Sequence, residues 1–73
     1  MHPATRHLLD QFHFDHLRTD HLRRVSQQFH DLAHDLAEVL NDGPELSAGL
    51  RKLLEAKDCC VRQAVMDAQP KES

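Results

Sequence analysis

The stretch Leu53-Leu54-Glu55-Ala56-Lys57-Asp58-Cys59-Cys60-Val61-Arg62 decides the fold of this chain. Its apolar residues belong to a three- and four-residue spacing that is typical of one face of an α-helix: Leu46, Leu50, Leu53, Leu54, Cys60, Val61, Ala64 and Val65. Lys57 and Asp58 interrupt this face, and a charge there costs free energy unless it is paired, hydrated or used. Either Lys57 reaches solvent at the edge of the face while Asp58 pairs with a basic neighbour, or the two charges mark a polar site inside a helical assembly.

The apolar spacing predicts two long helices. One runs from about residue 44 to residue 68 and ends before Pro70. The other begins with Thr19 or Asp20 as its N-cap and carries its own stripe over about five turns: Leu22, Val25, Phe29, Leu32, Ala33, Leu36, Ala37 and Leu40. Gly43 can take the left-handed conformation that ends a helix, and Pro44 suits the first position of the next helix. This short connection predicts an antiparallel helical hairpin.

The rest of the chain falls outside the hairpin. We expect an N-terminal segment over residues 1–18, in which Thr5 caps a short helix through Phe12, a hairpin domain over residues 19–68 and a frayed tail over residues 69–73. Two helices cannot cover both apolar stripes, so the remainder must meet the N-terminal segment or another copy. The predicted fold class is therefore all-α, an antiparallel two-helix hairpin with a short N-terminal helix, assembled as a homo-oligomer.

Composition narrows the function classes. The chain has 73 residues, three Phe, no Trp and no Tyr, so an isolated core would be thin. A net charge of -3 disfavours generic DNA binding, although seven His could reverse the charge near pH 6. No apolar run is long enough to cross a membrane. Cys59 and Cys60 are adjacent and point apart on a helix, so we expect small core residues in a reducing cytosol and no disulfide.

Two motifs bear on catalysis and metal binding. His30-Asp31-Leu32-Ala33-His34 has the i, i+4 histidine pair of a helical zinc site, with Asp in place of Glu. A catalytic site would also need a third protein ligand and a walled cleft. The cysteine pair lacks the C-x-x-C spacing of redox and zinc sites. We therefore predict no enzyme activity, no cofactor and no metal site, with a small metal-binding protein that uses His30 and His34 as the alternative.

The basic residues suggest a ligand site. With the bend near Gly43, cations of both long helices approach the open end of the hairpin near an aromatic ring, where a base can stack on the ring while cations hold phosphates. The candidate ligand-binding residues are Phe14, Arg23, Arg24, Lys52, Lys57 and Arg62. The alternative is ordinary surface charge with helix-stabilising partners, such as Asp20 for Arg24.

The order of these segments resembles a known family. Phe12-His13-Phe14 precedes a helix that ends in Leu36-Ala37-Glu38-Val39-Leu40, and after a short turn come Leu46-Ser47-Ala48-Gly49-Leu50-Arg51-Lys52-Leu53-Leu54-Glu55-Ala56 and Val61-Arg62-Gln63-Ala64-Val65. Over about Phe12 to Ala68 the chain is similar to the hairpin domain of phage anti-CBASS and anti-Thoeris sponge proteins. Those proteins sequester nucleotide-derived bacterial immune signals.

The resemblance implies a function and a partner. It implies a phage sponge in the host bacterial cytoplasm that binds a cyclic oligonucleotide or cyclic ADP-ribose signal between protomers of a hexamer or dimer-based assembly, without cleaving it. Phe14 takes the place of a base-contacting aromatic, usually Tyr, while Lys52, Glu55 and Arg62 match family positions. The family's basic residue in the first long helix is not matched, and Lys57-Asp58-Cys59-Cys60 replaces aromatic or Met positions, which leaves the ligand and the oligomer number open. The alternative function is a helical oligomeric protein-interaction module.

Overall fold

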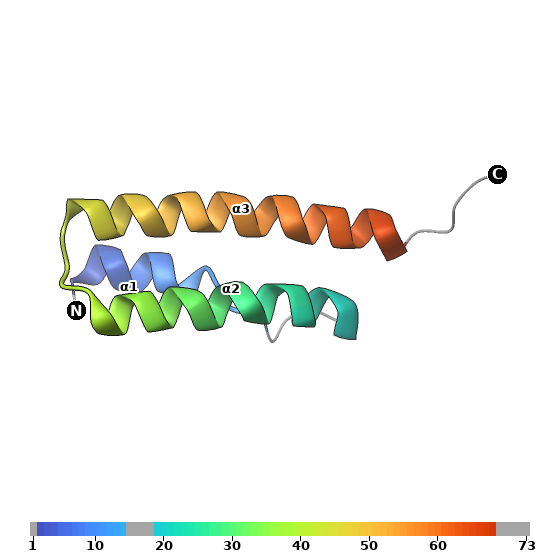
Figure 1. Cartoon of the computed structure of the whole chain (residues 1–73), viewed down its shortest axis with the longest axis horizontal. Helices are drawn as coiled ribbons and strands as arrows, with labels where there is room; N and C mark the ends of the chain where they lie inside the picture. The colour runs from blue at the N-terminus through green and yellow to red at the C-terminus, as the bar shows by residue number, and fades with distance from the viewer. Residues whose placement is uncertain (1, 15–18, 69–73) are drawn as a thin grey trace.

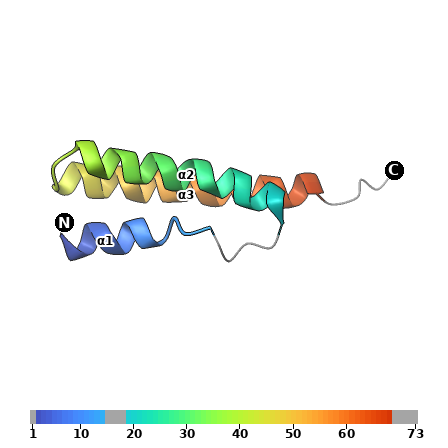
Figure 2. The same ribbon diagram turned by 90° about the horizontal axis from the view of Figure 1, so that it is seen from below.

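The described part of the chain, residues 2–14 and 19–68 of a computed structural model, contains three α-helices and no strand. They are α1 (Pro3–Asp10), α2 (Asp20–Val39) and α3 (Pro44–Ala68) (Figure 1). α2 and α3 run antiparallel as a hairpin, and α1 lies beside the half of the hairpin nearest the bend (Figures 1 and 2). The predicted all-helical hairpin with a short N-terminal helix is confirmed. None of the described helices is both long enough and apolar enough to span a membrane.

Both long helices begin where the sequence predicts. Thr19 is the N-cap of α2, and its side-chain oxygen accepts a hydrogen bond from the backbone N–H of Leu22 at 3.3 Å. α3 begins at Pro44, whose missing N–H is no loss in a first turn. The expected left-handed glycine at the bend is wrong, because no glycine in the described residues has a positive φ. Instead, α2 ends as Leu40 turns extended, with φ −108° and ψ 147°.

α1 begins earlier than the sequence predicts. His2, not Thr5, is the N-cap, and its Nδ1 atom accepts a hydrogen bond from the N–H of Ala4 at 3.0 Å. Pro3 then fits the first turn, where its fixed φ is already helical. Thr5 lies inside the helix and is 1 % exposed. An imidazole nitrogen thus replaces the hydroxyl that the sequence favours as the cap.

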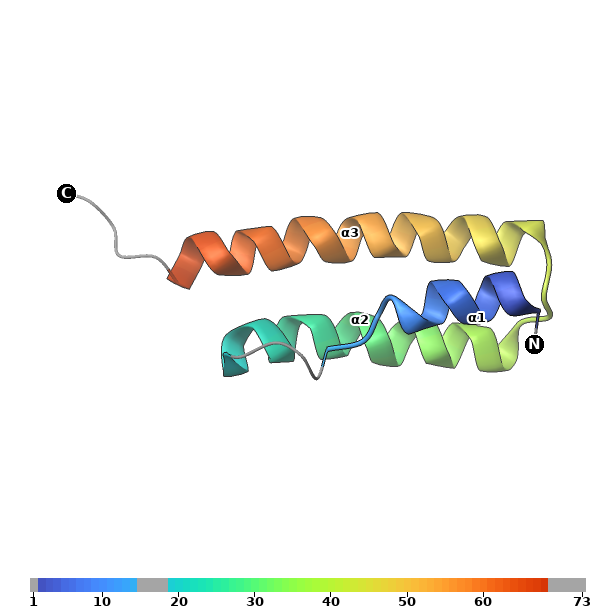
Figure 3. The same cartoon turned by 180° about the vertical axis from the view of Figure 1, so that it is seen from behind.

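The core is concentrated in the half of the molecule nearest the bend. α1 lies across α2 and α3 there (Figure 3) and brings its apolar side against both helices. The buried cluster draws on all three helices and on the residue that follows α1: Leu8, Leu9, Phe12, Ala33, Leu46 and Leu50. The half of the hairpin farther from the bend has no third helix in the described chain. Apolar side chains of α3 are therefore less covered there than near the bend.

Candidate functional site

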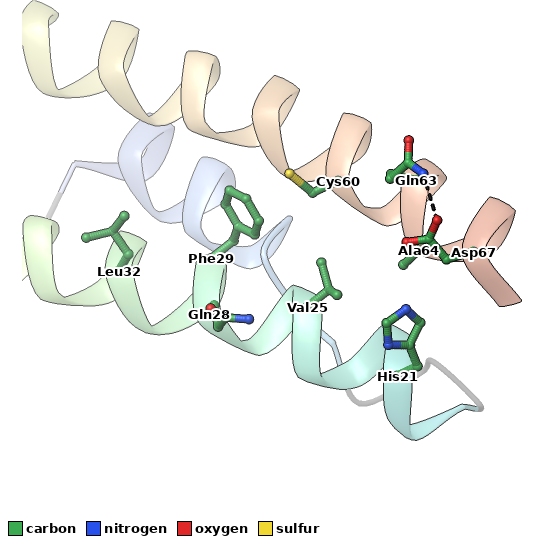
Figure 4. A pocket seen from close by; sticks show the side chains of 9 residues that line it. All are labelled: His21, Val25, Gln28, Phe29, Leu32, Cys60, Gln63, Ala64 and Asp67. Atoms are coloured by element: carbon green, nitrogen blue, oxygen red, sulfur yellow. Dashed lines mark hydrogen bonds between the residues drawn. The ribbon is translucent and has the colours of Figure 1, made fainter.

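A hollow lies between α2 and α3 in the half of the hairpin away from the bend. It has a volume of about 620 Å³, and α1 lies on the other side of the hairpin (Figures 3 and 4). The side chains of Val25 and Phe29 point into the space between the helices, with Cys60 above them (Figure 4). The hollow is lined by His21, Val25, Gln28, Phe29, Leu32, Cys60, Gln63, Ala64 and Asp67. Its floor is apolar and its rim is polar, as in many binding surfaces.

This hollow belongs to a longer face of the hairpin, opposite α1, which we call the uncovered face. Helical spacing extends the α2 side of the hollow into a row of larger apolar side chains, here the ridge: Val25, Leu32, Leu36 and Val39. The same spacing along α3 gives the row Gly49, Leu53, Ala56 and Cys60. Its small members, Gly49, Ala56 and Cys60, are here called the furrow, and the half-buried Leu53 lies between two of them. Leu32 is 46 % exposed and Val39 is 76 % exposed. Two side chains of the ridge are therefore on the surface of the single chain.

The sequence predicted that part of the apolar stripes would stay uncovered within one hairpin, but it did not place a hollow between Val25 on α2 and Cys60 on α3. The α2 stripe is wider than the contact that one partner helix can make. Cys59 and Cys60 were expected in the core, and this is wrong because both are exposed. Their positions on α3 turn away from α1, which covers the apolar face only near the bend.

Lys57 occupies a defined structural position. It is 9 % exposed, and its ammonium group donates a hydrogen bond to the backbone oxygen of Gln11 at 2.7 Å. Gln11 is the C-cap of α1, so the cation meets the negative end of that helix dipole. The Nζ atom also lies 5.9 Å from the ring centroid of the buried Phe12. The interruption of the apolar stripe is thus explained by a charge that joins α3 to the end of α1.

The electrostatics of Lys57 follow from this position. Burial lowers the pKa of the Lys57 ammonium below its usual value of 10.5, and the neighbouring Asp58 carboxylate opposes that shift. The amine is held by the Gln11 carbonyl, so it does not extend freely into any of the hollows described here. That Lys57 contacts a ligand stays a prediction. Its hydrogen bond to Gln11 offers a structural role as the alternative.

The other candidate residues are spread over the surface. Phe14 is half-buried and meets the ring of His30 edge-on, with a centroid separation of 5.1 Å. Arg23 pairs with Asp20 at 2.5 Å within α2, and Arg62 donates to the Sγ atom of Cys59 at 3.3 Å within α3. Arg24 and Lys52 are exposed. None of the six candidates lines the hollow between α2 and α3, so a single chain does not gather them around it.

Three histidines, His13, His30 and His34, gather on the side of the hairpin that carries α1. The rings of His30 and His34 lie 4.3 Å apart between centroids, and His30 Nδ1 is 3.0 Å from Asp31 Oδ1. Together with Leu9, Asp10 and His13 they line a smaller hollow of about 400 Å³. Among the residues that the structure describes, no three His, Cys, Asp or Glu side chains are placed to hold a metal ion.

Fold and hollow together define a class, a small three-helix protein with one uncovered amphipathic face. Comparisons with protein families, with characterised proteins and with solved structures gave no match.

Proposed function

We propose that this chain is a non-enzymatic helical binding protein that works as an assembly of copies and sequesters a nucleotide-derived signal. The observation that supports the binding role is the hollow of about 620 Å³ on the uncovered face. Small-molecule sites usually enclose about 300–1,000 Å³ and bury most of the ligand. A second copy laid over the open side of this hollow would provide the missing wall.

The class of ligand rests on the resemblance to phage sponge proteins and on the candidate residues. Arg24, Lys52 and Arg62 are exposed, so they are accessible to a ligand held between two copies. Guanidinium and ammonium groups bind phosphate oxygens, and the half-buried ring of Phe14 offers a surface for a base. These features support a cyclic oligonucleotide or cyclic ADP-ribose ligand, bound in the cytoplasm of a phage-infected bacterium.

A thermal-shift panel on the untagged protein tests this function. The panel contains cyclic dinucleotides, cyclic trinucleotides and cyclic ADP-ribose isomers. A ligand that binds only the native state at about 100 times its Kd stabilises that state by about 2.7 kcal/mol, which should raise the Tm by about 10 °C or more in a domain of this size. Mass spectrometry after denaturation should recover the ligand intact. No shift with any member of the panel would contradict the proposal.

Substitutions at exposed cations then test the site. We expect Lys52→Gln and Arg62→Gln each to weaken binding of the best panel ligand by about tenfold to a few hundredfold, because each removes a charge-assisted contact to phosphate. Arg51→Gln is the matched control, since Arg51 is also exposed on α3 but is not a candidate contact. Equal affinity in all three variants, measured by calorimetric titration, would remove these cations from the site.

A second candidate is a helical protein-interaction module, and the apolar floor of the hollow favours it. Val25, Phe29 and Leu32 present a surface on which the apolar side of a foreign helix could pack. This function predicts an assembly that none of the panel ligands stabilises. The same thermal-shift panel therefore separates the two candidates.

A further inference from the structure

The uncovered face carries two complementary shapes side by side. The ridge on α2 consists of branched apolar side chains. The furrow on α3 consists of residues with small side chains or none, namely Gly49, Ala56 and Cys60. α2 has 20 residues and therefore presents a face about 30 Å long. Helices pack by placing the ridges of one against the grooves of another.

Gly49 has no packing role within the protomer. It lies inside α3, where glycine is a poor helix former, and its backbone has no positive φ to require it. A Cβ atom built on Gly49 would meet nothing within 4 Å. The single chain thus gives no reason for the absence of a side chain there, whereas close approach of a second helix would supply one.

We infer that the uncovered face is an interface between two copies of this chain, in which the ridge of each copy packs into the furrow of the other. The inference deepens the assembly that the proposed function requires. A two-fold axis parallel to the helices places α2 of one copy against α3 of its partner. Leu36 on α2 and Gly49 on α3 lie at about the same distance along the hairpin from the bend. The two-fold axis therefore places Leu36 of one copy opposite Gly49 of the other copy.

The resulting arrangement is a four-helix bundle with the two α1 helices outside. α2 and α3 are antiparallel within a protomer, and the same axis keeps them antiparallel across the interface, as in up-down bundles. The uncovered face fits a second copy of the chain, because one surface carries both a ridge and a furrow. In a two-fold symmetric contact, the ridge of each copy meets the furrow of the other, so the same contact forms twice. The hollow then closes against the partner's helices.

The experiment measures the molar mass of the untagged protein by light scattering after gel filtration. We expect the wild type to have at least twice the chain mass at tens of micromolar. Gly49→Gln places a long side chain in the furrow and should yield mostly chain-mass protein at the same concentration. Arg51→Gln introduces the same residue two positions away, on another side of α3, and should leave the mass unchanged.

Circular dichroism checks that Gly49→Gln is still folded. Because nothing lies within 4 Å of a Cβ atom at position 49, the variant should keep the helical content of the wild type. Val39→Gln is the second variant, because Val39 is 76 % exposed and its loss cannot unfold the protomer. It should also reduce the mass. A chain-mass wild type, or unchanged mass in both variants, would overturn the interface. A Gly49→Gln protein that is monomeric but still stabilised by a panel ligand would uphold the interface and contradict only the need for assembly in binding.

Discussion

At the scale of single residues, Lys57 joins two helices, because its side chain on α3 reaches the end of α1. Its ammonium group donates a hydrogen bond to the carbonyl of Gln11, one of the carbonyls at the end of α1 that have no partner within the helix. The same group is nearly buried, so it is desolvated whenever it carries its charge. The Lys57 side chain thus makes two opposite contributions to the free energy of folding: its contact with the end of α1 is favourable, and its loss of hydration is unfavourable.

Lys57→Met should lower the free energy of unfolding by about 1–3 kcal/mol, because the Gln11 carbonyl loses a charged donor while the apolar stem is kept. Urea denaturation followed by circular dichroism measures this change. Lys52→Met is the control, since Lys52 is exposed on the same helix. Equal losses in the two variants would show that the contact with Gln11 contributes nothing to stability.

The stability contributed by Lys57 should also depend on pH. Because burial lowers the pKa of Lys57, the folded state binds fewer protons than the unfolded state just below pH 10.5. The free energy of unfolding then rises as the pH climbs through the interval between the folded pKa and 10.5. The stability difference between wild type and Lys57→Met should therefore widen toward alkaline pH. A difference that narrows there would contradict the direction of the pKa shift.

Ser26 presents the opposite case, a buried polar group without a matching contact. Its side chain is 0 % exposed, and its Oγ atom has no hydrogen-bond partner among the described residues. Ser26→Ala should leave stability unchanged or raise it by up to about 1 kcal/mol, because an unsatisfied hydroxyl is removed. That limit corresponds to about 4–8 °C in Tm for a domain of this size. A clear fall in Tm by calorimetry would indicate that Ser26 has a partner.

At the scale of elements, α1 is attached to the hairpin at both of its ends. Its beginning is held by Asp42 in the bend, where the carboxylate accepts a hydrogen bond from the N–H of His2 at 2.8 Å. Its end is held by Lys57 of α3. Leu8 and Leu9 of α1, and Phe12 just after it, pack into the core. The short helix is therefore a structural part of the fold, and its register is set by residues distant in sequence.

Asp42→Asn should weaken the attachment of the beginning of α1 at neutral pH and remove part of the acid sensitivity of the protein. The hydrogen bond from the His2 backbone lowers the pKa of Asp42 below its usual 3.8. A carboxyl with a lowered pKa adds stability above pH 3.8 and loses it as the pH falls through the folded pKa. The stability difference between wild type and Asp42→Asn should shrink below pH 3.8.

Asp35→Asn is the control for this titration, since Asp35 is an exposed carboxylate on α2. Chemical denaturation at several values between pH 6 and about pH 2.5 supplies the measurement. A stability difference that stays constant over this range would remove Asp42 from the acid response.

At the scale of the whole molecule, the two halves of the described chain differ. The half nearest the bend has three helices around a common core, whereas the described residues of the other half leave a hollow between two helices. If copies associate through the uncovered face, folding is coupled to association, and the Tm should rise with protein concentration. Calorimetry at about 5 and about 200 µM tests this expectation. A Tm that is independent of concentration would indicate a protomer that is stable alone.

The sequence by itself determined the helices and their order. Thr19, Pro44 and the three- and four-residue apolar spacing act within a few residues of the chain, so they can be interpreted without knowing the fold. The tertiary structure alone decided how those helices use their faces. Lys57 is buried and Cys60 is exposed because α1 covers one side of α3 near the bend and leaves the opposite side open. Which side a third helix covers depends on contacts between distant residues, such as Lys57 with Gln11 and His2 with Asp42, and local periodicity does not encode them.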